Sequence, residues 1–376
     1  MLEKQKKIHS MKIKLCVFLF LTAYNLCFSQ YPSLSQQTKV SIFTCGKGQE
    51  LYTTFGHTAI RIKDDINKLD VVFNYGQFDF REGNFYVKFV KGNLQYCIGV
   101  ATYEDFIFEY QHENRAVIEQ TLNVSQKQKQ QLFDALVSAQ YSPEESHYTY
   151  KFIDRNCTTM VVEQLNAILS QKLISKVDDK SVSYRTVLYP KFDNYFWYKL
   201  GINIIFGTKV DQKANQLFLP EELLNSLDKL TISGKPFVEK KEIVVKDSQP
   251  QYKFSFFNSI YFVLLLLILL FFINNERLLN VYFVLSGLIG LFLCFVGLYS
   301  LHQELLYNYN ALLFNPLFIL IPFLKNQTWL KNILRICFVA LIVYLLFMIN
   351  KPHLFLISPF IIFHLAIIIK KYFKIK

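Results

Sequence analysis

The segment DRNCTTMVVEQLNAILS (residues 154–170) predicts an amphipathic helix that begins at Asn156-Cys157. The apolar side chains that recur at helical spacing on one stripe are Val161, Leu165, Ile168 and Leu169. A helix start presents unpaired amides and a partial positive charge, which lower a thiol pKa and favour the thiolate. Cys157 is therefore a candidate nucleophile, and Asn156 a candidate donor to a developing oxyanion. The alternative is a small buried residue, because free Cys is mostly buried and inert.

A thiolate nucleophile needs a base, and the best-placed histidine is His57 in LYTTFGHTAIRI (residues 51–62). The residues after His57 alternate as a strand, which places the imidazole at a sheet edge. A third polar group should orient the ring, and Asn74 on a neighbouring predicted strand is the candidate, with Asp79 behind it. Each also has an ordinary structural reading, since His, Asn and Asp are common at strand ends.

Around these residues the chain reads as a folded α+β domain over residues 31–250. Runs rich in β-branched and aromatic residues predict strands at 40–44, 58–63, 70–75, 94–100 and 116–122. Ser125 is placed to cap a second amphipathic helix, SQKQKQQLFDALVSAQ. The charged stretch 238–253 reads as a link to the next part of the chain.

Composition indicates a membrane protein, because 52% of the 376 residues are hydrophobic and 16% are aromatic. The net charge of +12 is concentrated in residues 1–14 and 370–376, so no nucleic-acid partner is expected. Residues 1–29 read as a secretory signal, with a basic start, an apolar run and a small residue at the cleavage point. The alternative is an uncleaved anchor helix.

Residues 251–376 predict an all-α transmembrane domain of about five helices. The apolar runs are 256–273, 278–301, 311–324, 332–349 and 353–369. The run 311–324 is short and contains two prolines, and the alternative for it is a kinked or re-entrant segment. An exported domain and five spans place the C-terminus in the cytoplasm, in agreement with the basic loops on that side. The outer face then carries four candidate substrate-binding residues beside the apolar spans, His302, Asn308, Asn310 and Asn315. The alternative for them is solvated loop residues.

The cysteines of the exported domain are Cys45, Cys97 and Cys157. In an oxidising compartment Cys45 and Cys97 are a candidate disulfide, which leaves Cys157 as the odd thiol. No Cys-x-x-Cys or His-x-x-x-His spacing supports a metal site, and no Gly-rich loop supports nucleotide binding, so no cofactor is expected.

In order and spacing, five segments resemble a Bacteroidetes membrane-protein family that has the Lnb N-terminal periplasmic domain. They are FGHTAIRIKD (55–64), VVFNYGQFDF (71–80), NFYVKFVKGNLQYCIGV (84–100), DRNCTTM (154–160) and FLPEELL (218–224). A strand His followed by a helix-start Cys also resembles the circularly permuted papain-like enzymes, such as lecithin:retinol acyltransferase-like and NlpC/P60-like proteins.

The resemblance implies a lipoprotein N-acyltransferase of the bacterial inner membrane. Cys157 would be the nucleophile and His57 the general base, a membrane phospholipid the acyl donor and a lipoprotein the acceptor. Two alternatives remain. One is a membrane-tethered papain-like hydrolase that cleaves peptidoglycan, and the other is a non-enzymatic envelope assembly protein.

Overall fold

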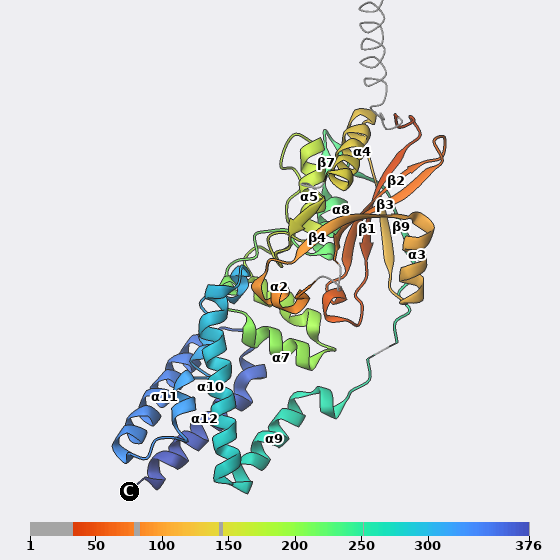
Figure 1. Cartoon of the computed structure of the whole chain (residues 1–376). Helices are drawn as coiled ribbons and strands as arrows, with labels where there is room; N and C mark the ends of the chain where they lie inside the picture. The colour runs from red at the N-terminus through yellow and green to blue at the C-terminus, as the bar shows by residue number, and fades with distance from the viewer. Residues whose placement is uncertain (1–32, 79–82, 143–145, 251, 376) are drawn as a thin grey trace, which may run out of the picture.

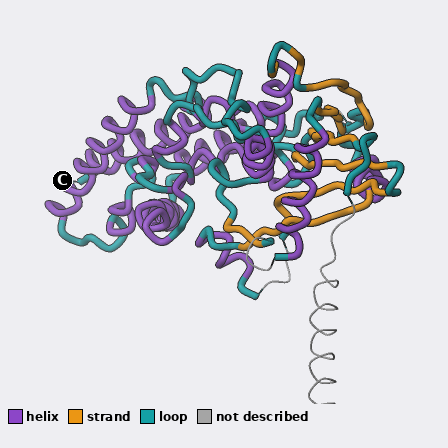
Figure 2. Tube along the Cα trace, turned by 90° about the horizontal axis from the view of Figure 1, so that it is seen from above, coloured by secondary structure: helices purple, strands orange, loops and turns teal. Residues whose placement is uncertain are grey.

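The computed structural model describes residues 33–78, 83–142, 146–250 and 252–375. The predicted signal peptide and Asp79 lie outside the described residues. A domain built on a β-sheet stands at one end of the molecule, and a bundle of apolar helices extends from it (Figure 1). Seen from above, the strands gather at one end and the bundle at the other (Figure 2). The chain ends at the tip of the bundle farthest from the sheet.

The main sheet of the described residues has the order β6-β4-β3-β2-β1-β5-β9, and all its neighbours are antiparallel. Its strands are β1 (Lys39–Cys45), β2 (His57–Asp64), β3 (Leu69–Gln77), β4 (Gln95–Thr102), β5 (Val117–Leu122), β6 (His147–Thr149) and β9 (Val238–Val245). The five predicted strands are confirmed. The prediction of a link at 238–253 is wrong in its first half, because β9 pairs with β5 as a lysine-rich edge strand.

Helices cover both faces of this sheet (Figure 1). On one face, α4 (Gln126–Tyr141), α5 (Cys157–Ile168) and α8 (Pro220–Lys229) enclose the larger core of the domain. On the other, α3 (Tyr103–His112) covers a smaller core. The predicted helix starts are confirmed, since Ser125 and Asn156 each form a capping box.

Several other described elements are shorter. They are α2 (Phe85–Lys91), α6 (Tyr184–Leu188), α7 (Phe196–Ile205), β7 (Thr231–Ile232), β8 (Lys235–Pro236) and the 3-10 helices η1 (Leu51–Thr53), η2 (Tyr189–Phe192), η3 (Thr208–Asp211) and η4 (Phe256–Asn258). The side chains of α7 pack into the core of the bundle, so the two parts share an apolar interior.

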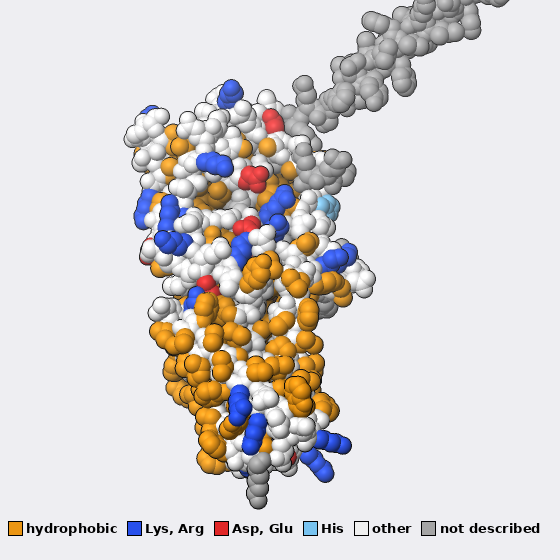
Figure 3. Space-filling model, turned by 90° about the vertical axis from the view of Figure 1, so that its left-hand side faces the viewer, with side chains coloured by type: hydrophobic (Ala, Val, Ile, Leu, Met, Phe, Trp, Pro, Cys, Tyr) orange, Lys and Arg blue, Asp and Glu red, His pale blue; other side chains and the backbone are white. Residues whose placement is uncertain are grey.

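The bundle contains α9 (Ile260–Ile273), α10 (Glu276–Tyr299), α11 (Gln327–Met348) and α12 (Leu354–Lys374). Among the described residues, the last three are long and apolar enough to cross a membrane. The 14 residues of α9 reach only about 21 Å, against a hydrocarbon core of about 30 Å. Hydrophobic side chains cover the bundle surface, and lysines and arginines lie at its far end (Figure 3).

The prediction of about five helices is wrong for the run 311–324. This run holds the end of η6 (Tyr309–Ala311) and all of η7 (Pro316–Leu320), with η5 (Gln303–Leu305) just before it. The segment packs along α10 at glycines, and a Cβ on Gly290 would lie 1.4 Å from the Phe314 carbonyl oxygen. Irregular backbone is tolerated at membrane depth only where protein covers it. The small residues of α10 let the helix lie close enough to cover this segment.

Candidate active site

The start of α5 is held by the Asn156 side chain. Its Oδ1 accepts hydrogen bonds from the backbone N–H groups of Thr158 and Thr159, both at 3.0 Å. Its Nδ2 donates to the carbonyls of Phe152 at 2.9 Å and Phe218 at 3.0 Å. Both amide hydrogens are therefore committed, and the predicted role of Asn156 as an oxyanion donor does not fit this arrangement.

The same capping leaves one amide of the first turn unused. Met160 N–H donates to the Asn156 carbonyl, and the Asn156 side chain accepts from the two amides before it. The backbone N–H of Cys157 has no hydrogen-bond partner among the described residues. It lies beside the thiol at the positive end of the helix dipole, so it is the better-placed donor for a developing oxyanion.

His57 lies at the first position of β2 and meets both Asn74 and Cys157. Its Nε2 lies 3.1 Å from Asn74 Oδ1, which can only accept, so Nε2 carries the proton. The ring also makes a hydrogen bond with the Cys157 sulfur, for which Nδ1 is left. The structure thus brings together Cys157, His57 and Asn74 as the sequence predicted, although 100 residues separate His57 from Cys157.

The pKa shifts of this pair favour a thiolate and an imidazolium. Burial alone would raise the pKa of Cys157, but the His57 charge, the His57 hydrogen bond, the Thr58 backbone N–H and the Thr158 hydroxyl lower it below its usual value. Burial would lower the pKa of His57, yet the charge of the sulfur and the hydrogen bonds to Cys157 and Asn74 raise it. Each group therefore stabilises the charged form of the other.

Two features of the wall around the sulfur have no local sequence signal. Gly76 has a φ of +103° near the end of β3, and a Cβ there would lie 3.8 Å from both Cys157 Cβ and the Tyr148 hydroxyl. The Tyr148 side chain is 3% exposed, and its hydroxyl has no hydrogen-bond partner among the described residues. A buried, unpaired donor costs free energy, so this hydroxyl is free to donate to a group bound beside the sulfur.

The structure places Asn308 and Asn310 in the junction between the two parts of the molecule, away from solvent. Asn308 Nδ2 donates to the carbonyls of Ile204 and Ile205, at 2.9 and 2.7 Å. Asn310 Nδ2 donates to those of Asn203 and Ile204, and Tyr344 donates to its Oδ1 at 2.7 Å. Their amide hydrogens are all used to dock η6 onto α7, so they are not free to donate to a substrate, and the predicted role in substrate binding stays a prediction.

The other two predicted outer-face residues are also placed by the backbone around them. Asn315 is 8% exposed and caps η7 by accepting from the Leu317 N–H at 3.0 Å. His302 precedes η5 and packs so closely on Gly92 that a Cβ there would lie 3.0 Å from its ring. Their predicted role in substrate binding stays a prediction, while Asn315 already has a structural one.

The predicted disulfide between Cys45 and Cys97 is wrong, since both thiols are free. Cys45 lies on β1 and Cys97 on β4, and β2 and β3 run between these strands. Three strand spacings of about 4.8 Å separate the two residues, which is far beyond the Cα separation of about 7 Å that a disulfide tolerates. No group of three His, Cys, Asp or Glu side chains in the described ranges is arranged to hold a metal ion.

Comparison with known families gives one match. Residues 31–189 match the family model described as the Lnb N-terminal periplasmic domain. This range contains Cys157, His57, Asn74 and Tyr148. No curated protein and no solved structure matches the chain.

Proposed function

Since the chain belongs to the Lnb-type family by its N-terminal periplasmic domain, we propose that it is a lipoprotein N-acyltransferase that works through a Cys157 thioester. The observation that carries the proposal is the Cys157–His57–Asn74 arrangement at a helix start. The order of these residues along the chain is that of the permuted papain-like enzymes, and we assign the domain to that fold.

The first step acylates the enzyme. The Cys157 thiolate attacks a phospholipid ester carbonyl, and the Cys157 N–H and the Tyr148 hydroxyl stabilise the oxyanion. The ester C–O bond then breaks, and the departing alcohol takes its proton from the His57 imidazolium. The products of this step are a lysophospholipid and a thioester on Cys157.

The second step transfers the acyl chain. The α-amino group of the N-terminal cysteine of a diacylglyceryl lipoprotein attacks the thioester carbonyl and gives up a proton to His57. The C–S bond breaks, which regenerates the thiolate and leaves an amide on the lipoprotein. Both substrates carry lipid, so a site held at the membrane surface keeps water away from the thioester.

A buried junction supports this transferase over a hydrolase that is merely tethered to the membrane. Arg185 is 1% exposed, and its guanidinium donates to Asp211 at 2.9 Å, to Asn203 Oδ1 at 3.1 Å and to two carbonyls. Asp211 in turn accepts from the Tyr309 hydroxyl of η6 at 2.9 Å. A domain on a flexible tether needs no such network, whereas a site that takes its substrate from the membrane must be held at a fixed position relative to the bilayer.

The basic residues of the bundle indicate its orientation in the membrane. Arg277 lies in the first turn of α10, Arg335 donates to Tyr372 near the end of α12, and Lys371 and Lys374 lie in the last turn of α12. This end of the bundle lies away from the sheet domain (Figure 1). Basic loops stay in the cytoplasm. We therefore place the chain in the inner membrane, with the sheet domain in the periplasm and the C-terminus in the cytoplasm.

Complementation of a strain that lacks lipoprotein N-acylation tests the function. Wild type should restore the amide-linked chain on lipoprotein N-termini, as read by mass spectrometry, while Cys157→Ala and His57→Ala should not. Cys97→Ala serves as the matched control, since this thiol lies on β4 outside the arrangement. Full N-acylation by Cys157→Ala would refute the thioester mechanism, and cleaved peptidoglycan without N-acylation would favour the hydrolase.

A further inference from the structure

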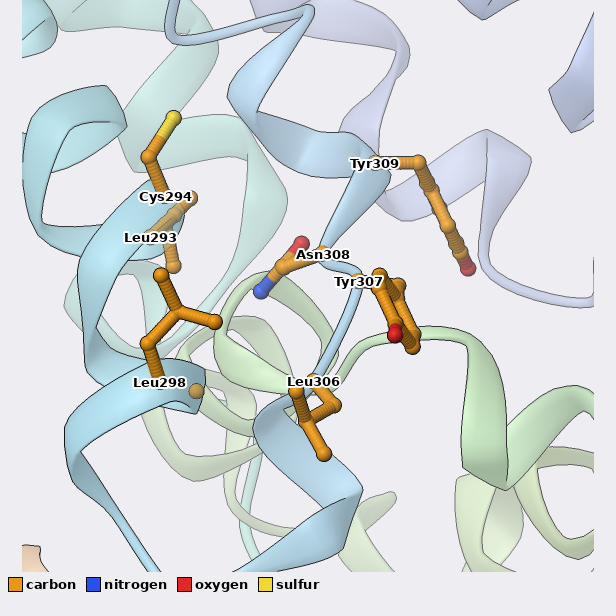
Figure 4. Close-up of a pocket in the computed structure, with 8 residues that line it drawn as sticks. Leu293, Cys294, Leu298, Leu306, Tyr307, Asn308 and Tyr309 are labelled. Atoms are coloured by element: carbon orange, nitrogen blue, oxygen red, sulfur yellow. The ribbon is translucent and has the colours of Figure 1, made fainter.

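A crevice of about 280 Å³ opens between α10 and the loop that follows η5. Leu293 and Leu298 of α10 form one side, and Leu306 and Tyr307 of the loop form the other (Figure 4). Gly297 lets the loop pack closely on the helix, because a Cβ there would lie 2.8 Å from the Leu305 carbonyl oxygen.

The lining of this crevice is mainly apolar and holds few groups for a polar ligand. Its one amide side chain, Asn308, has both hydrogens committed to the carbonyls of α7, and its oxygen accepts from the Asn310 N–H. The rest of the lining is mainly hydrocarbon, so the ligand that fits is apolar.

The crevice faces the surrounding lipid near the sheet domain. Leu298 is 73% exposed and Tyr307 is 79% exposed, so both present large hydrophobic side chains at the surface. Two residues beyond α10, the Leu301 N–H donates to the carbonyl of Lys91 at the end of α2, so this end of α10 adjoins the sheet domain. Tyr307 also has a φ of +51°, a strained value for a residue with a side chain.

An apolar cluster connects this region with the candidate active site. Val296 of α10 and Leu305 of η5 are members of this cluster, and the half-buried Phe55 and Phe152 pack against the cluster. The Phe55 and Phe152 rings are 5.2 Å apart. Phe55 precedes His57 by two residues, and Ile153, which donates its N–H to Glu304 Oε1, lies in the segment that runs into Cys157.

We propose that this crevice holds one acyl chain of the phospholipid donor, taken from the leaflet that faces the sheet domain. The inference rests on the proposed function, because it names the donor site of that reaction. The volume is slightly below the roughly 300–1,000 Å³ of ordinary ligand pockets, which suits one chain and excludes a whole phospholipid.

Photocrosslinking of the full chain in vesicles locates the chain directly. The probe is phosphatidylethanolamine with a diazirine in one acyl chain, and the vesicles contain no lipoprotein. We expect adducts concentrated on peptides that contain 293–298 and 306–309. Adducts spread evenly over the lipid-facing residues of α10, α11 and α12 would overturn the proposal.

A pair of tryptophan variants on α10 tests the consequence for the reaction. Leu298→Trp fills the crevice. If two methylene groups of the acyl chain lose their burial, the affinity of the site for the lipid falls about tenfold. We expect about that loss in adducts on 306–309 and in the rate of thioester formation on Cys157 at limiting lipid. Leu291→Trp, which is exposed on the same helix outside the lining, should change neither.

The two readouts separate this proposal from the one on which it rests. Localised adducts without any thioester would retain the lipid site and refute the acyl-enzyme. A thioester that forms equally fast in Leu298→Trp and Leu291→Trp would refute the crevice as donor site and retain the acyl-enzyme. Repeating the crosslinking with Cys157→Ala should leave the adducts in place, since binding needs no sulfur.

Discussion

At the scale of single residues, the site depends on the proton shared by Cys157 and His57. The lowered thiol pKa and the raised imidazole pKa both shift the pair towards thiolate and imidazolium. At low pH the sulfur is protonated, and at high pH His57 loses its proton and can no longer serve the leaving group. Activity should therefore follow a bell-shaped pH profile.

Alkylation by iodoacetamide tests the thiol directly. The thiolate reacts, so the rate at Cys157 should reach half its maximum below the usual thiol pKa of 9.0. His57→Ala removes the two largest lowering causes and leaves burial, so the midpoint should move to higher pH. Cys97 is the internal control, because burial raises its pKa and it should react only at high pH. Equal midpoints for Cys157 and Cys97 would contradict the ion pair.

Tyr148→Phe separates a role in the reaction from a role in the fold. No described residue forms a hydrogen bond with this hydroxyl, so its removal should leave the thermal midpoint unchanged or slightly raised. Thioester formation should fall by about a hundredfold if an oxyanion donor is lost.

Tyr184→Phe is the reverse control for this variant. Its hydroxyl accepts from the Gln216 N–H, and its loss should cost about 1 kcal/mol of stability with little change in rate. A Tyr148→Phe protein with full activity would remove the hydroxyl from the mechanism.

At the scale of elements, the contact between α10 and the irregular segment 301–324 should tolerate no added atom. A methyl group at position 290 would overlap the Phe314 carbonyl, so Gly290→Ala should destabilise the protein by about 2 kcal/mol or more. Thermal unfolding in detergent micelles measures the change.

Gly201→Ala in α7 is the matched control, since no other packed part of the described structure lies within 4 Å of the added methyl group. It should stabilise the helix by up to about 1 kcal/mol. Similar destabilisation by both substitutions would mean that the segment does not pack on the glycines of α10.

At the scale of the whole molecule, the junction around Arg185 fixes the site over the bundle. Arg185→Met leaves Asp211 buried without its guanidinium partner. The partners that remain are Lys351, whose Nζ is 3.5 Å from Asp211 Oδ1, and the Tyr309 hydroxyl. Breaking a buried pair costs about 3–5 kcal/mol. We expect a large fall in the unfolding temperature and loss of acyl transfer to lipoprotein, with the bundle and sheet domain unfolding in separate steps.

Lys241→Met provides the comparison for the junction, because it removes an exposed ion pair with Asp228 on the sheet domain. Such pairs contribute about 0–1 kcal/mol. If calorimetry shows one cooperative transition of unchanged midpoint for Arg185→Met, the junction does not couple the two parts.

Local patterns in the sequence predicted five strands, two capped helices, the three long apolar helices among about five expected spans, and the meeting of Cys157, His57 and Asn74. These depend on periodicity, capping residues and segment order, all of which are written into short stretches of chain. Only the tertiary structure decided that β2 and β3 separate Cys45 from Cys97. The same holds for the absence of an α-helix from residues 311–324 and for the docking of two parts of the molecule by Asn308 and Asn310. The tertiary structure also decided that the Tyr148 hydroxyl lies near the sulfur. In each case the deciding partner is a backbone or side chain far away in sequence, and only the order of strands and the packing of helices determine which distant groups meet.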